Sequence, residues 1–358
     1  MTARLGLQMA PWRRCDELVE LGRSLSGVVD IVWVQDQMLA RNMYVVLAAL
    51  AHAGCGVGSN VTYAVGRNPN EMASAAGTIS ELVPDGREMV LGFGTGGALV
   101  TSLFRRERPV AVAREAISLM RRLWTGEAVE LDGFPVLGEA MGYRRGAVAQ
   151  LTYPVERPPA IVVAGVGPKI LRVAGGLADG LICPSNMPTL CLAAFNTGRF
   201  DELSGLDTAR AARPVDAPPL RLIFGINVSV SMDREQARTY ARRQLALVVG
   251  NPRLWPDLEA VGLDVESAGE VKAAFDAGLG VEGAAARMSD SLCDSLIVSG
   301  TPEECVEPMA QLRDLAAAHG FEEYYIGAPL GPDPLEAAEL LRTHLIPQLW
   351  PERATAAR

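Results

Sequence analysis

Histidine and lysine are scarce in this chain. Its 358 residues include three histidines, His52, His319 and His344, and two lysines, Lys169 and Lys272. None of the histidines is expected at the active end of a strand, so a histidine-based metal site lacks ligands. No GxSxG elbow of a serine hydrolase is present either. We therefore expect no catalytic metal, and a reaction that is carried by a bound cofactor.

Basic clusters, long apolar runs and paired cysteines are also missing. A net charge of −9 without clustered cations argues against a nucleic-acid partner. No apolar run reaches the ~18 residues that span a bilayer, so no membrane partner is expected. The six cysteines form no CxxC pair, which argues against a zinc ribbon or a disulfide framework. Residues 1–10 lack the features of a secretion signal, so we expect a cytoplasmic protein.

Short apolar runs alternate with longer amphipathic stretches over most of the chain. This order is typical of βα units, and eight candidate strands predict an α/β fold, a single (β/α)₈ TIM barrel over residues 1–358. The expected strands are Arg4 to Ala10, Asp30 to Gln35, Gly56 to Thr62, Glu88 to Gly94, Ala160 to Gly165, Gly180 to Pro184, Leu220 to Ser229 and Glu323 to Gly327. The expected helices are Asp16 to Leu25, Met43 to Ala53, Pro69 to Leu82, Val110 to Trp124, Lys169 to Ala178 and Arg234 to Val249.

Two connections are too long for simple loops. One covers residues from about 126 to 159 and is rich in Gly and Pro, and the other covers residues from about 251 to 320 and is largely helical. We expect both to be insertions that form a wall or lid of the pocket. In the second, Thr301-Pro302-Glu303-Glu304 is a capping box that predicts a helix through Ala318.

A parallel barrel places its active site at the C-terminal ends of the strands. Gln8, Asp36 and Gln37 fall at the first two of these ends. Asp36 is a candidate acid or polar anchor with Gln8 and Gln37 as hydrogen-bonding neighbours; the alternative is an aspartate that caps the next loop.

Two glycine-rich tips follow later strands. Gly94-Thr95-Gly96-Gly97 would let a flat ring approach the backbone, or is simply a tight turn. It is no dinucleotide fingerprint, because the next helix is expected only around Pro109. Gly165-Val166-Gly167-Pro168-Lys169 opens a helix, whose free amides would face a phosphate. Lys169 would add a cation there, or is a solvated lysine of the first turn.

Several short motifs follow one another in a specific order along nearly the whole chain. They are Val32-Trp33-Val34-Gln35-Asp36; Gly58 to Thr62 leading to Arg67-Asn68-Pro69; Asp85-Gly86-Arg87 followed by Leu91 to Gly96; Gly167-Pro168-Lys169 running into Ala178-Asp179-Gly180; Ser299 to Glu303; and Gly327 to Pro334. In this order they resemble the luciferase-like monooxygenase superfamily, particularly its deazaflavin-dependent branch, which methylenetetrahydromethanopterin reductase typifies.

The resemblance implies a barrel that holds coenzyme F-420, an 8-hydroxy-5-deazaflavin, or alternatively FMN. The ring would lie across the strand tips, in front of a non-proline cis peptide that matches Asn60-Val61, and the phosphate would rest on the turn that starts at Gly165. The cofactor-binding residues that it implies are Asn60, Val61, Thr62, Gly94, Thr95, Gly96, Gly97, Gly165, Val166, Gly167, Pro168 and Lys169.

The chain departs from this branch at two positions. Relatives often have a histidine after the strand-two aspartate and an acidic residue after the strand-four glycines, where this chain has Gln37 and Gly97. The leading hypothesis is hydride transfer from reduced coenzyme F-420 to a C=N or conjugated C=C bond of a small metabolite. An FMN-dependent monooxygenase and a non-catalytic barrel subunit are the alternatives. The resemblance also implies a homodimer through Met43 to Ala53 and Glu71 to Ile79.

Overall fold

The computed structural model describes residues 3–183 and 191–353 of the chain. Eight parallel strands form a barrel in the order β1 (Arg4–Met9), β2 (Ile31–Val34), β3 (Val57–Tyr63), β4 (Met89–Gly94), β7 (Ala160–Ala164), β8 (Gly180–Cys183), β9 (Arg221–Val230) and β11 (Glu323–Leu330). Pairing of β8 with β9 and of β11 with β1 closes the ring. The predicted TIM barrel is confirmed, and each predicted strand overlaps an observed one, while Pro184, the predicted end of the sixth strand, lies outside the described residues.

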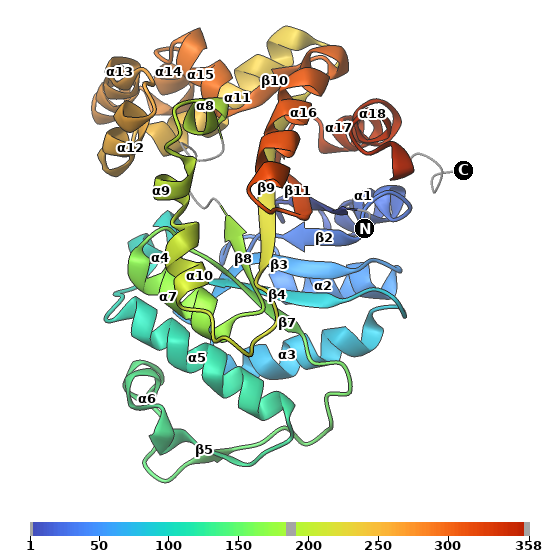
Figure 1. Ribbon diagram of the computed structural model, residues 1–358, viewed down its shortest axis with the longest axis vertical. Coiled ribbons are helices and arrows are strands. Elements are labelled where there is room, and N and C mark those ends of the chain that lie inside the picture. Colours follow the sequence, from blue (N-terminus) through green and yellow to red (C-terminus); the bar gives the residue numbers. More distant parts are fainter. Residues whose placement is uncertain (1–2, 184–190, 354–358) are drawn as a thin grey trace.

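Helices cover the outside of the barrel (Figure 1). They include α1 (Cys15–Leu25), α2 (Met43–His52), α3 (Pro69–Leu82), α5 (Pro109–Trp124), α7 (Pro168–Leu177), α10 (Leu206–Ala211), α11 (Arg234–Val249), α16 (Pro302–Ala318), α17 (Pro334–Leu340) and α18 (Ile346–Leu349). Local signals start several of them: the Asn68 side chain accepts a hydrogen bond from the Asn70 amide, and Pro69 takes the first position of α3. The capping box predicted at Thr301 is present at the start of α16.

Several short helices were not predicted, and one of them contradicts an explicit expectation. The short α4 (Ala98–Leu103) begins directly after Gly97, whereas we expected no helix before Pro109. Its start carries no side-chain cap, and its six residues include no charge, so the sequence offers no start signal.

The barrel interior is filled by two aromatic side chains and several aliphatic ones. Trp33 lies between β1 and β3, where a Cβ on Gly6 or Gly58 would come within 2.5 or 2.6 Å of its ring. A Cβ on Gly225 would lie 2.4 Å from the Tyr325 ring. These glycines are required because they leave space for the rings.

A ring of ion pairs closes the N-terminal end of the barrel. Arg221 on β9 contacts Glu88 and Glu323, each at 2.7 Å, and Arg4 also pairs with Glu88. The four side chains are partly buried, and each charge has an opposite neighbour. Access to the barrel is therefore from the C-terminal ends of the strands.

The two insertions lie at opposite ends of the molecule (Figure 1). The first holds β5 (Val129–Glu130), α6 (Pro135–Met141) and β6 (Val148–Ala149), and it packs on the outer helices. For example, the Tyr153 hydroxyl donates to the Ser74 carbonyl of α3 at 2.7 Å. The second forms a helical layer of α12 (Trp255–Ala260), α13 (Val265–Asp276), α14 (Gly280–Ala285) and α15 (Asp290–Leu296), followed by β10 (Val298–Gly300), which pairs with the end of β9.

Strand β3 carries the irregularity that the resemblance implied. The Asn60-Val61 peptide bond is cis, and the pairing of β3 with β4 shifts between Ser59 and Thr62. Ser59 is opposite Leu91 and Thr62 opposite Phe93, so β3 contains one extra residue. Asn60 and Val61 form this bulge.

Candidate active site

A cavity of about 1290 Å³ opens at the C-terminal ends of the strands. Of the 15 predicted site residues, 14 line it, and Thr62 lies directly behind them. The structure thus brings the ends of β1, β2, β3, β4 and β7 around one space. The second insertion contributes Asn251 and Leu254 to its lining, while the first supplies no lining residue among those described.

Asp36 is held by two side chains. Arg67 donates to both carboxylate oxygens at 2.6 Å, and the Thr62 hydroxyl donates to one of them at 2.7 Å. The Asp36 side chain is only 1% exposed, against 17% for Arg67. The Arg67 guanidinium also lies 5.4 Å from the centre of the Tyr44 ring. This arrangement fixes the loop after β2 to the loop after β3.

The two predicted glutamines are also engaged. The Gln37 amide donates to the Gln35 side chain at 2.7 Å and accepts from the Trp12 indole. Gln8 accepts from the Ala328 amide at 3.2 Å. Because amide side chains do not titrate, these residues can orient a bound group but cannot act as acids or bases.

Asn60 and Tyr325 face each other at the mouth of the barrel. Burial raises the pKa of Tyr325 to about 12. Tyr325 is therefore a neutral phenol at ordinary pH. The Asn60 Nδ2 atom is buried without a hydrogen-bond partner among the described residues, which is costly unless a ligand accepts from it.

The glycine tip after β4 is supported from outside the cavity. The Arg106 guanidinium donates to the Thr95 and Gly96 carbonyls at 3.0 and 2.7 Å. Gly96 has a φ of +89°, which favours glycine. A Cβ built on Gly97 meets no atom within 4 Å, so this backbone faces open space.

The turn between β7 and α7 presents the helix start to the same cavity. Gly167 occupies the N-cap position without a side-chain cap, so the first amides of α7 have no side-chain acceptor there. A Cβ on Gly167 also meets nothing within 4 Å. Exposed Lys169 lies in the first turn, and together these groups provide a positive, open seat for an anion.

Several residues at the site were not predicted as site residues, and four of them bear on its chemistry or shape. Asn227, Tyr325 and Leu254 line the cavity, and Arg67 holds Asp36 in place. Arg67 belongs to the Arg67-Asn68-Pro69 motif, which was a signal available in the sequence. Asn227 and Tyr325 look like ordinary strand residues, and only closure of the barrel brings them to the site.

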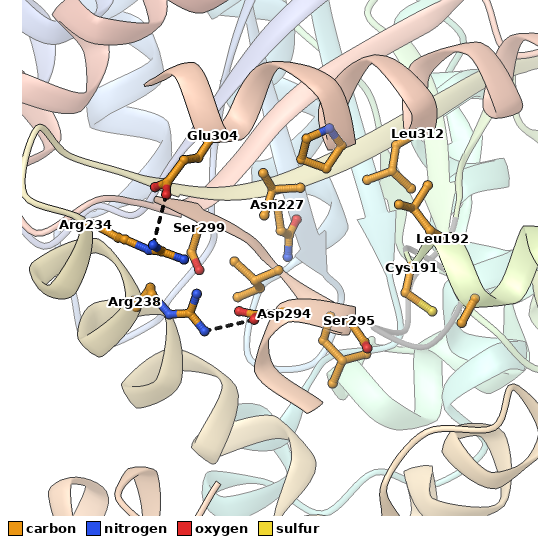
Figure 2. A pocket seen from close by; sticks show the side chains of 15 residues that line it. Cys191, Leu192, Asn227, Arg234, Arg238, Asp294, Ser295, Ser299, Glu304 and Leu312 are labelled. Carbon is orange, nitrogen blue, oxygen red and sulfur yellow. Dashed lines mark hydrogen bonds and ion pairs between the residues drawn. The ribbon is translucent and has the colours of Figure 1, made fainter. Parts of the chain in front are cut away.

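A second cavity, of about 510 Å³, lies beside the end of β9 and shares Asn227 with the first. Figure 2 shows its charged side chains in two ion pairs, Arg234 with Glu304 at 3.3 Å and Arg238 with Asp294 at 2.8 Å. The pairs balance each other, so this cavity has no strong preference for either sign of charge.

Two features are absent from residues 3–183 and 191–353. No helix there combines the length and apolar character needed to cross a bilayer. In the same residues, no group of three or more His, Cys, Asp or Glu side chains is arranged to hold a metal ion.

Comparison with known proteins agrees with this geometry. The sequence profile described as luciferase-like monooxygenase matches residues 26–319. A 5,10-methylenetetrahydromethanopterin reductase of Archaeoglobus fulgidus is 30% identical, over 97% of this chain and 99% of the relative. An F-420-dependent glucose-6-phosphate dehydrogenase of Nocardia farcinica is 30% identical, over 79% of this chain and 75% of the relative.

Solved structures show the same fold. The coenzyme F-420-dependent tetrahydromethanopterin reductase of Methanopyrus kandleri superposes with a TM-score of 0.75 at 20% identity, covering 98% of this chain and 100% of that one. The resemblance inferred from the ordered motifs is thus confirmed, as is its assignment to oxidoreductases. The chain belongs to the luciferase-like monooxygenase family.

Proposed function

We propose that this protein is a deazaflavin-dependent oxidoreductase, which transfers a hydride from reduced coenzyme F-420 to a C=N or conjugated C=C bond of a small organic metabolite. The observation that carries the proposal is the convergence of the β3 bulge, the β4 glycine tip and the β7–α7 turn around one cavity. The Nocardia farcinica relative, which is named as F-420-dependent, supports this cofactor over FMN.

The residues present fit such a cofactor. Gly97 and Gly167 leave open the space that a side chain would fill, the unpaired Asn60 Nδ2 offers a donor, and the start of α7 with Lys169 suits a phosphate. When bound, the deazaflavin supplies the hydride. The protein then has to hold the ring flat, position the substrate against it and exclude water.

We assign Asp36 the role of an anchor and not that of an acid. Its two oxygens already accept three hydrogen bonds from Arg67 and Thr62, and its side chain is almost fully buried. Asn60 and the neutral Tyr325 phenol are the donors that we place against the ring or the substrate. Gln8 and Gln37 orient the loops around them.

The test is a parallel titration of the purified full chain with coenzyme F-420 and with FMN. Quenching of deazaflavin fluorescence at micromolar concentration, with a rise in Tm, supports the proposal. Tighter binding of FMN and oxygen uptake with reduced FMN would replace it by the monooxygenase. If neither cofactor binds, the chain is a non-catalytic barrel.

We also propose that the protein forms a homodimer through α2. This helix has no charged side chain before its terminal His52, and Val45 on its outer side is 62% exposed. A helix that is apolar all round needs a second covering surface. Light scattering during size exclusion should give twice the chain mass, and Val45→Glu should return a monomer; a wild-type monomer at high concentration contradicts the dimer.

A further inference from the structure

A groove on the outside of the barrel runs between α5 and α7 and meets the active-site cavity at Val110 and Lys169. Its volume is about 600 Å³. Its floor is apolar and at least half-buried, and its rim is formed by four exposed cations, Arg108, Arg114, Lys169 and Arg172.

The rim carries more positive charge than the described residues around it neutralise. No carboxylate is among the described residues that line the groove, although the whole chain has a net charge of −9. Arg108 pairs with Glu139, but Arg114 approaches Glu115 only to 3.9 Å. Lys169 and Arg172 form no hydrogen bond or ion pair with another described residue. The cavity beside β9 differs, since each of its two arginines pairs with an acid that also lines the cavity.

We propose that this groove binds the oligoglutamyl chain of coenzyme F-420, an inference that rests on the proposed function. The phosphate assigned to the start of α7 is a diester in this cofactor, and a lactyl group and γ-linked glutamates continue from it. The groove begins at Lys169, at the same helix start. Each glutamate brings a carboxylate for the rim and methylene groups for the apolar floor. FMN ends at its phosphate and has nothing to occupy the groove.

The test compares three ligands on the full chain: the tail-less 8-hydroxy-5-deazariboflavin, coenzyme F-420 with one glutamate, and coenzyme F-420 with five or more. Dissociation constants come from fluorescence quenching at low and high salt. The variant is Arg114→Glu/Arg172→Glu. The control is Arg23→Glu/Arg145→Glu, which changes the net charge equally at two exposed arginines outside the groove. Thermal unfolding checks that both variants fold.

For the wild type we expect affinity to rise with tail length. The groove variant should bind the long-tailed form about tenfold more weakly at low salt, with the difference shrinking as salt screens the charges. Its affinity for the tail-less form, and all affinities of the control, should stay within about twofold of wild type.

The possible failures are distinguishable. Equal affinity of the wild type for the long-tailed and one-glutamate forms overturns the groove inference but leaves the proposed function intact. The same holds if the groove variant loses affinity equally for all three ligands. If the wild type binds none of the three deazaflavins, the proposed function itself fails, and the groove inference with it.

Discussion

Replacing Arg67 by methionine tests what Asp36 does. The substitution keeps most of the side-chain volume but removes both hydrogen bonds of 2.6 Å to a carboxylate that is 1% exposed. Removing one partner of a buried ion pair leaves an uncompensated charge, which costs about 3–5 kcal/mol of unfolding free energy. Asp36→Asn should cost less, about 1–3 kcal/mol, because Arg67 is 17% exposed and can reach water.

The double variant Asp36→Asn/Arg67→Met separates coupling from general damage. Since the two side chains act on each other, it should cost less than the sum of the single variants, by about 0.5–3 kcal/mol. Urea unfolding, followed by circular dichroism, gives the energies, and cofactor titration of each variant gives the effect on the site. If Asp36→Asn unfolds like wild type and binds cofactor normally but loses turnover a hundredfold, Asp36 is a proton donor and the anchor role is wrong.

Three further outcomes follow from the geometry. Gly167→Val should weaken cofactor binding at least tenfold with unchanged Tm. The control Gly133→Val, at a position in the first insertion that is equally open, should change neither affinity nor Tm. Equal effects of the two variants would contradict a phosphate site at the start of α7. Arg221→Met should cost about 2 kcal/mol in urea unfolding and leave cofactor affinity unchanged, because it leaves Arg4 as the one remaining ion-pair partner of Glu88 and Glu323 among the described residues at the closed end. Unchanged stability would contradict the role of this ring of ion pairs. Burial raises the pKa of four tyrosines in the folded state to about 12, above the ordinary value of 10.0. Their contribution to the free energy of unfolding should therefore be fully present below pH 10 and be lost between pH 10 and 12, with tyrosinate absorbance rising as the chain unfolds. Titration of these tyrosines near pH 10 in the folded state would refute this. The four are Tyr63, Tyr143, Tyr324 and Tyr325.

The fold could be predicted because its signals are local. Apolar runs of strand length, Asn68 before Pro69 and the capping box at Thr301 each act over a few neighbouring residues. The β3 bulge was predictable only through the family resemblance, since nothing in the residues around Asn60 and Val61 distinguishes them from a regular strand.

The site residues that the sequence did not predict are brought there by contacts between distant parts of the chain. Arg67 is 31 positions from Asp36, and Tyr325 is 100 positions beyond Gly225, the glycine that gives its ring space. The cations of the groove between α5 and α7 are a further example of residues that come together only in the folded chain. Arg114 and Arg172 are far apart in a sequence that has no basic cluster, and packing of two helices brings them to one rim.

Gln37 and Gly97 stand where relatives often have a histidine and an acidic residue, and this restricts which bonds the proposed reaction can reduce. Four titratable groups are found among the described residues that line the cavity. Asp36 is ion-paired with Arg67, Lys169 lies at the proposed phosphate site, and the other two are the phenols of Tyr63 and Tyr325. Burial holds the pKa of both phenols at about 12, which makes them poor proton donors near neutral pH. Reduction of a neutral C=C bond requires a proton together with the hydride, whereas a cationic C=N carbon accepts the hydride alone. A site without a free acid therefore favours an iminium substrate, and its hydride-transfer rate should not change with pH while the phenols stay neutral. A rate that falls with rising pH would instead require a proton donor.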